Sequence, residues 1–192
     1  MNKFVSDYSS CDTDIVLPSG SCTSMIRNHY SALCNQNDFG NVEDISTRTF
    51  EFTEYITHKL GIFDLSPFKS ETAERINVTY HESCHLNREL GISKEPISLL
   101  KSLENINLIY MAQSEVCCGF GGTFSTKYPE ISTAMAEEKI ANVKQTGAEV
   151  VTASDMSCLM HMGGFMIKKN LDIKSLHIAQ LMDLAMGTDH KK

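Results

Sequence analysis

Four cysteines in the second half of the chain have the residue type and the spacing of metal ligands. They are Cys84, the adjacent pair Cys117 and Cys118, and Cys158, with 32 and 39 residues between them. Thiolates are soft ligands that favour iron–sulfur clusters, zinc or copper(I). Adjacent cysteines seldom bind one zinc ion without strain, whereas a multi-iron cluster accepts both sulfurs on different irons. The spacing therefore favours a cluster, with zinc, a redox-active dithiol or ordinary buried thiols as the alternatives.

The adjacent pair lies in a glycine-rich segment, EVCCGFGG, at residues 115–122. Glycines adopt backbone conformations that are closed to other residues, and successive exposed N–H groups attract an anion. Such a loop is suited to surround a cluster bound by thiolates. A helix expected just after Cys158 would add the positive end of its dipole at the same place.

Histidines and one arginine near these cysteines are further candidates. His161 follows Cys158 by three residues and could be a mixed ligand, since imidazole can replace thiolate on iron, or a polar residue at a helix start. His81 and His85 flank Cys84 and could donate to a cluster or handle a proton, or have structural roles. Arg88 could bind a carboxylate or a cluster, or pair on its own helix.

Alternating strands and helices must position these residues. Apolar runs predict five strands, and helical spacing predicts six helices between and after them. The predicted strands are 14–17, 76–80, 106–111, 149–153 and 173–177, and the predicted helices are 25–33, 42–61, 95–103, 129–146, 159–169 and 176–186. This alternation predicts an α/β fold, a parallel sheet covered by helices. Because the carboxyl ends of parallel strands share one edge, the cysteine-bearing loops should converge there.

A weak internal repeat suggests two related parts. IVLPSGSCTSM at Ile15–Met25 has the same plan as VVTASDMSCLMH at Val150–His161, a strand, a polar turn, a cysteine and a helix. Cys22 is thus the counterpart of Cys158. The stretch 61–74, with Ser66 and Pro67, is predicted to connect the two parts.

Composition excludes several classes of protein. The 192 residues are 42% apolar with a formal charge of -7, so nothing indicates binding to nucleic acid or to an anionic membrane. No run of about 18 apolar residues that could span a membrane and no amino-terminal secretion signal is visible. An odd number of cysteines, seven, argues against a disulfide framework. These features predict a cytoplasmic protein without an integral membrane segment.

Three segments together resemble the cysteine-rich (CCG) domain of heterodisulfide reductases and their relatives, and most closely the lactate utilization protein A family. They are VTYHESCH at Val78–His85, CCGFGG at Cys117–Gly122 and DMSCLMH at Asp155–His161, and SGSC-x-x-MIR at Ser19–Arg27 adds to the resemblance. The resemblance implies two CCG units in tandem, an incomplete first unit with a connecting helix at 1–70 and a complete second unit at 71–192. The early cysteine and vicinal pair of the first unit are absent.

The resemblance also implies a cofactor and its ligands. Relatives bind a [4Fe–4S] cluster, and the matching ligand positions of the second unit are Cys84, Cys117, Cys118 and Cys158. Cys22 falls on the surviving ligand position of the first unit. His161 and Met25 replace the last cysteine of the C-x-x-C that ends the fuller motif, which departs from a five-cysteine ligand set.

The function implied is that of an electron-transfer component of an L-lactate-oxidising complex that yields pyruvate, with companion subunits that include another iron–sulfur protein. No Gly-x-Gly-x-x-Gly follows a predicted strand, so this chain alone should not oxidise lactate. A component of a glycolate oxidase or of a heterodisulfide-reductase-like thiol oxidoreductase is a second hypothesis. A zinc-bound or metal-free interaction module is a third.

Overall fold

The computed structural model describes residues 1–68 and 74–187. The first part contains mostly short helices and two strands, in the order α1 (Asn2–Tyr8), β1 (Ile15–Leu17), α2 (Gly20–Ser24), π-helical η1 (Met25–His29), α3 (Tyr30–Leu33), 3-10 helical η2 (Gln36–Asp38), α4 (Phe39–Thr47), β2 (Thr49–Glu51), α5 (Phe52–Glu54), π-helical η3 (Tyr55–Lys59) and 3-10 helical η4 (Ser66–Phe68). β1 and β2 pair in parallel, with Val16 opposite Phe50.

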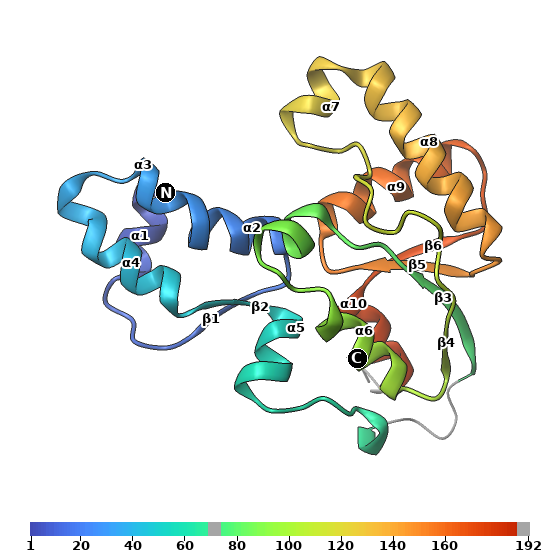
Figure 1. The fold of residues 1–192 in the computed structure, drawn as a ribbon, viewed down its shortest axis with the longest axis horizontal. Helices are drawn as coiled ribbons and strands as arrows, with labels where there is room; N and C mark the ends of the chain where they lie inside the picture. The colour runs from blue at the N-terminus through green and yellow to red at the C-terminus, as the bar shows by residue number, and fades with distance from the viewer. Residues whose placement is uncertain (69–73, 188–192) are drawn as a thin grey trace, which may run out of the picture.

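The second part is a four-stranded parallel sheet in the order β4-β3-β5-β6. Its elements are β3 (Ile76–Tyr80), π-helical η5 (His85–Glu89), α6 (Lys94–Ser102), β4 (Ile106–Leu108), α7 (Thr123–Lys127), α8 (Pro129–Gln145), β5 (Val150–Ala153), α9 (Met156–Lys168), β6 (Lys174–His177) and α10 (Ile178–Met186). The predicted α/β fold with helix-covered parallel strands is confirmed (Figure 1).

Helices cover both faces of this sheet because neighbouring strand residues point to opposite sides. Val150 packs in a core with residues of α6 and α10, whereas Val151 packs in a second core with residues of α8 and α9. Figure 1 shows the two pairs of helices on opposite sides of the strands. Cys118 and Cys158 belong to the core on the α8–α9 side. This core therefore forms one wall of the candidate site.

One predicted element is wrong. The apolar spacing of Phe52, Tyr55, Ile56 and Leu60 predicts a continuous helix over 42–61, but the strand β2 (Thr49–Glu51) interrupts it. Glu51 ends the strand and caps the next helix, accepting from the backbone N–H of Thr53 at 2.7 Å. Pairing with β1, far away in the sequence, extends three residues that local spacing assigns to a helix.

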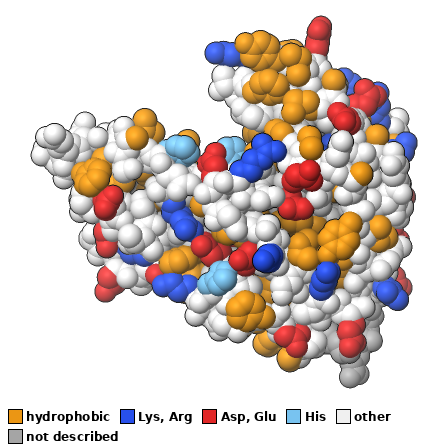
Figure 2. Space-filling model, viewed as in Figure 1, with side chains coloured by type: hydrophobic (Ala, Val, Ile, Leu, Met, Phe, Trp, Pro, Cys, Tyr) orange, Lys and Arg blue, Asp and Glu red, His pale blue; other side chains and the backbone are white. Residues whose placement is uncertain are grey.

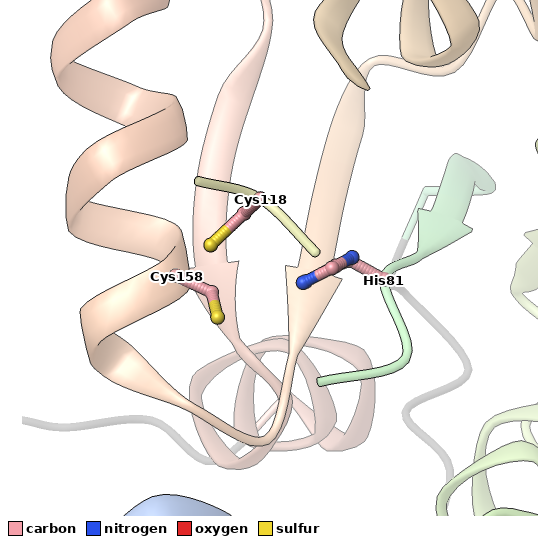
Figure 3. A group of neighbouring side chains, drawn as sticks. All are labelled: His81, Cys118 and Cys158. Carbon is pink, nitrogen blue, oxygen red and sulfur yellow. The ribbon is translucent and has the colours of Figure 1, made fainter. Parts of the chain in front are cut away.

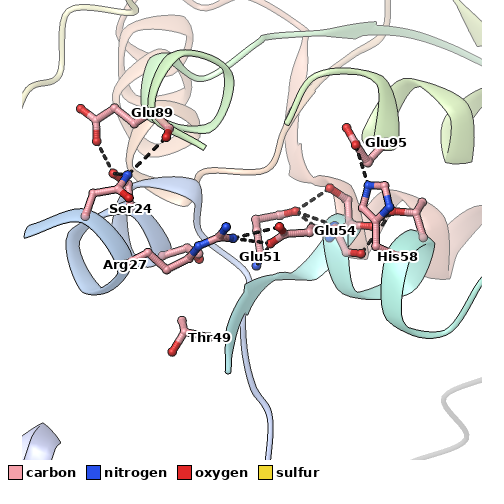
Figure 4. A network of polar contacts seen from close by, with 12 residues as sticks. Ser24, Arg27, Thr49, Glu51, Glu54, His58, Glu89 and Glu95 are labelled. Atoms are coloured by element: carbon pink, nitrogen blue, oxygen red, sulfur yellow. Dashed lines mark hydrogen bonds and ion pairs between the residues drawn. The ribbon is translucent and has the colours of Figure 1, made fainter. Parts of the chain in front are cut away.

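Polar contacts join the two parts of the chain (Figure 4). His58 on η3 contacts Glu95 on α6 at 2.8 Å, and Ser24 on α2 donates to the carboxylate of Glu89 on η5. Ser19 forms an isolated bridge with Asp155, just before α9. The division into units at 1–70 and 71–192 stays a prediction, and residues 69–73 of the predicted connection 61–74 lie outside the described residues.

Within the described residues, no helix is long and apolar enough to cross a membrane.

Candidate metal centre

The loops that follow three neighbouring strands carry the four predicted cysteines to one edge of the sheet. Cys84 follows β3, and Cys117 and Cys118 lie in the long loop after β4. Cys158 lies in the first turn of α9, after β5. That helix begins at Met156, earlier than the predicted residue 159, so Cys158 is inside its amino-terminal turn rather than before it. Parallel pairing brings these carboxyl ends together, as expected.

The four thiols form a contiguous group. Cys117 lies in hydrogen-bonding contact with both Cys118 and Cys84, and these contacts lower the pKa of Cys117. Cys118 in turn contacts Cys158, and this contact lowers the pKa of Cys158 to about 5 although burial raises it. The same contacts, together with burial, raise the pKa of Cys84 and of Cys118. The pKa shifts of neighbouring thiols in the group therefore have opposite directions.

His81 completes the group from the loop after β3. Its side chain is fully buried, and its ring nitrogen lies within 4.8 Å of the sulfurs of Cys118 and Cys158. Figure 3 shows the ring of His81 and the two thiol groups turned toward one another. Nδ1 of His81 lies 3.1 Å from the carbonyl oxygen of Ser114, and Nε2 has no hydrogen-bond partner.

Backbone geometry of the glycine-rich loop fits this arrangement. The N–H of Gly119 donates to the sulfur of Cys117 at 3.3 Å. Gly119 has φ of +92°, and a Cβ there would lie 2.7 Å from the carbonyl oxygen of Ser132. Because only glycine has this conformation without a clash, the sequence places glycine where the backbone turns its donor toward a thiolate.

The ammonium group of Lys139 lies beneath the same loop, a position that was not predicted from the sequence. Lys139 is only 2% exposed and donates to the carbonyls of Gln113 and of Ser114. Burial lowers its pKa, whereas Glu115 and the nearby cysteines raise it. Its position could have been found, because Lys139 interrupts the buried stripe of α8 that contains Ala136, Ile140 and Val143.

The other candidate residues lie around the group rather than in it. Nε2 of His161 lies 3.3 Å from the hydroxyl of Ser132, on the side of Gly119. His85 places Nδ1 3.6 Å from the sulfur of Cys84. Arg88 donates to the carbonyl of Glu115 at 3.4 Å. The roles of His161 and Cys22 as ligands stay predictions.

Cys22 lines a cavity of about 530 Å³ between the two parts of the chain. His29, His85 and Glu89 also line the cavity, together with apolar residues. Cys22 itself is exposed. Figure 2 shows the surface hollowed between the amino-terminal part and the segment around α7 and α8. His85, which lines the same cavity, also lies beside the sulfur of Cys84, and the placement of Cys22 toward the thiol group stays a prediction.

The donors present fit a metal or an iron–sulfur cluster. The imidazole nitrogen of His81 and the sulfurs of Cys118 and Cys158 lie within 4.8 Å of one another in a buried place, and the half-buried thiols of Cys84 and Cys117 adjoin them. All of these are soft or intermediate donors. An N–H donor already directed at the sulfur of Cys117 is the kind of contact that stabilises a thiolate ligand.

Comparison with known proteins agrees with this chemistry. Residues 78–163 match the family model of the cysteine-rich domain, CCG. The chain is 37% identical over 170 residues to lactate utilization protein A 2 of Bacillus cereus (strain 03BB102), a match that covers 88% of this chain and 68% of that protein. It is 39% identical over 171 residues to lactate utilization protein A of Oceanobacillus iheyensis, with the same coverage of both chains. The chain therefore belongs to the lactate utilization protein A family.

Proposed function

We propose that the protein is an iron–sulfur component of a cytoplasmic system that oxidises L-lactate to pyruvate, and that it transfers electrons. The contiguous group of four thiols at one sheet edge carries the redox part of this proposal. The relatives are named for lactate utilization, and this supports the metabolic part. The partners are companion subunits of the same system, one of them a further iron–sulfur protein.

The ligands proposed for the cluster, of the [4Fe–4S] type, are Cys84, Cys117, Cys118 and Cys158. Such a cluster accepts and releases one electron at a time. Cys118 and Cys158 are 1% and 6% exposed, so their burial limits the access of water to this side of the site. The N–H of Gly119 offsets negative charge at the sulfur of Cys117. The ammonium of Lys139 contributes positive charge beneath the loop.

Spectroscopic reduction by substrate tests this function. The anaerobically loaded chain, mixed with the companion subunits of a relative, should lose visible cluster absorbance when L-lactate is added. Glycolate and a pair of thiols, added in place of lactate, test the related oxidoreductase functions, because two thiols donate two electrons when they form a disulfide. Bleaching by glycolate or by the thiols alone would contradict the lactate assignment. A cluster that none of the three electron donors reduces, in a mixture that still oxidises lactate, would contradict the electron-transfer role.

A zinc-stabilised interaction module is the second candidate function. One observation favours it. The ligand atoms of His81, Cys118 and Cys158 lie within 4.8 Å of one another, which is close enough to bind a single ion. Zinc commonly binds histidine and cysteine together in structural sites. Metal analysis of the purified chain separates the two candidates, because the zinc module contains no acid-labile sulfide.

A further inference from the structure

Nε2 of His81 is a buried nitrogen without a hydrogen bond of normal geometry among the described residues. His81 is 0% exposed, and its ring faces the thiols of Cys118 and Cys158, of which it lowers the pKa of Cys158. Buried polar atoms without a partner are rare in native proteins and call for an explanation such as a bound ion. An ion that binds Nε2 would have to lie between Nε2 and the sulfurs of Cys118 and Cys158.

The hydrogen bond of the other ring nitrogen determines the tautomer of the neutral ring. Nδ1 lies 3.1 Å from the carbonyl oxygen of Ser114. A carbonyl oxygen only accepts hydrogen bonds, so Nδ1 carries the proton and donates it. A neutral imidazole then has its lone pair on Nε2, which is the arrangement of a metal-binding histidine backed by a backbone carbonyl.

The backing carbonyl is itself held in place. The carbonyl oxygen of Ser114 accepts from Lys139 at 3.3 Å and from the backbone N–H of Glu82 at 3.2 Å. The hydroxyl of Ser114 donates to the carboxylate of Glu82 at 2.6 Å. These contacts join the loop after β4 to the end of β3, so the ring of His81 has a defined orientation before any metal binds.

We propose that Nε2 of His81 is a fifth protein ligand of the metal centre, bound beside the thiolates of Cys118 and Cys158. The three donor atoms lie within 4.8 Å of one another. Metal bonds of about 2.0 Å to imidazole and about 2.3 Å to thiolate fit a triangle of this size after small side-chain rotations. The inference rests on the proposed function for the identity of the centre as an iron–sulfur cluster, but the donor set itself would also serve a single ion.

Neither of the other nearby histidines has this combination of features. His161 directs Nε2 to the hydroxyl of Ser132, and His85 is half-exposed beside Cys84. His81 also differs from His177, a second buried histidine whose Nε2 lacks a partner but which lies outside the group of thiols. His177 is therefore a matched control for the loss of a buried imidazole.

Pulsed electron paramagnetic resonance on the full chain, loaded anaerobically with iron and sulfide, tests the ligand directly. We expect a strong nitrogen hyperfine coupling in a paramagnetic oxidation state. The coupling should change to that of ¹⁵N when the protein is made with ¹⁵N-histidine. It should vanish in His81→Gln and His81→Cys and persist in His177→Gln. His81→Cys supplies a thiolate instead, so it should retain iron better than His81→Gln.

Anaerobic titration with Co²⁺ keeps the inference separate from the proposed function. We expect His81→Gln to weaken Co²⁺ binding more than about tenfold and to shift its ligand-field bands, with His177→Gln like the parent. Iron and sulfide bound without histidine coupling would overturn the inference and leave the proposed function standing. Co²⁺ bound through His81, by a chain that takes up no iron and sulfide, would support the inference and overturn the proposed cluster. If both His81 variants fail to fold, the labelled parent alone decides between coupling and its absence.

Discussion

The four cysteines differ in the direction of their pKa shifts although they share one site. Their contacts lower the pKa of Cys117 and Cys158 and raise the pKa of Cys84 and Cys118. A metal binds the deprotonated form, so it must displace the protons of the two thiols whose pKa is raised. Metal binding by this group should therefore depend on pH.

Affinity for a soft metal should therefore increase with pH. For the metal-free chain we expect the binding of Co²⁺ or Zn²⁺ to tighten between pH 6.5 and 8.5, by about tenfold per pH unit for each displaced proton. Competition with a chelator of known pH dependence measures the slope. An affinity that does not change over this range would contradict the raised pKa of Cys84 and Cys118.

Lys139 should contribute to stability through the two carbonyls that it holds. Lys139→Met keeps most of the buried volume of the side chain but removes its donors to Gln113 and Ser114. We expect the metal-free chain to lose about 1–3 kcal/mol of unfolding free energy, measured by urea denaturation. Lys144→Met, at an exposed position of the same helix, is the control and should change little. Equal stability of the two variants would show that the buried ammonium holds nothing in place.

At the scale of elements, the junction between β2 and α5 depends on a buried carboxyl group. Glu51 is fully buried, and burial raises its pKa to about 7 although Thr53 and Glu54 donate to its carboxylate. The folded state therefore binds the Glu51 proton more tightly than the unfolded state does. The stabilising contribution is complete below the unfolded pKa of about 4.5 and is lost as the pH rises through 7.

Glu51→Gln should remove this dependence because the amide stays neutral and still offers a carbonyl oxygen to the same donors. The parent should lose roughly 3 kcal/mol of unfolding free energy through this group between pH 5 and pH 8, and the variant should not. Urea denaturation at several pH values measures the difference. Glu138→Gln on the exposed side of α8 should show no such change. Parallel pH profiles of Glu51→Gln and the parent would refute the raised pKa.

Strands buried on both faces could be predicted from the sequence, whereas strands that depend on distant pairing could not. The runs at β3 and β5 are apolar because helices cover both sides of the sheet, and their bounds agree closely with the prediction. β2 has three residues with little apolar character of its own, and only its pairing with β1 defines it. Local spacing carries no information about that partner.

In the candidate site, too, some features could be predicted from local sequence and others depend on distant contacts. The cysteines could be predicted because their spacing follows the strands, and parallel pairing then brings them together. The orientation of the His81 ring depends on the carbonyl of Ser114, which lies 33 residues away in the sequence. No local pattern describes such a contact. Lys139 was missed although its interruption of an apolar stripe was visible.

At the scale of the whole molecule, one carboxylate joins the two parts of the chain. Asp155 accepts from the N–H of Ser157 in α9 at 3.1 Å and from the N–H of Ser21 in α2 at 2.8 Å. Burial raises the pKa of Asp155, but the donors of Ser157 and Ser21 outweigh it and leave this pKa below its ordinary value. The turn that contains Cys22 and the helix that contains Cys158 therefore share one anchor.

Asp155→Ala should destabilise both α2 and the first turn of α9, because it removes the acceptor of both hydrogen bonds. Loss of the helix cap alone costs about 1–2 kcal/mol, so urea denaturation should detect a drop of at least this size. Hydrogen exchange should become faster both at Ser21 and in the first turn of α9. Asp172→Ala, at an exposed position, is the control. Faster exchange in α9 alone, with Ser21 unchanged, would mean that the carboxylate does not join the two parts.

Iron and acid-labile sulfide per chain, determined after anaerobic loading and removal of unbound metal, test the central claim most directly. The claim is that the grouped thiols hold an iron–sulfur cluster. The parent should contain iron and sulfide in equal amounts, and Cys118→Ser should lose most of both. Cys34→Ser should remain like the parent, because Cys34 donates to the carbonyl of Ser31, away from the group. A parent that contains zinc without sulfide, or a Cys118→Ser variant with undiminished iron and sulfide, would contradict the claim.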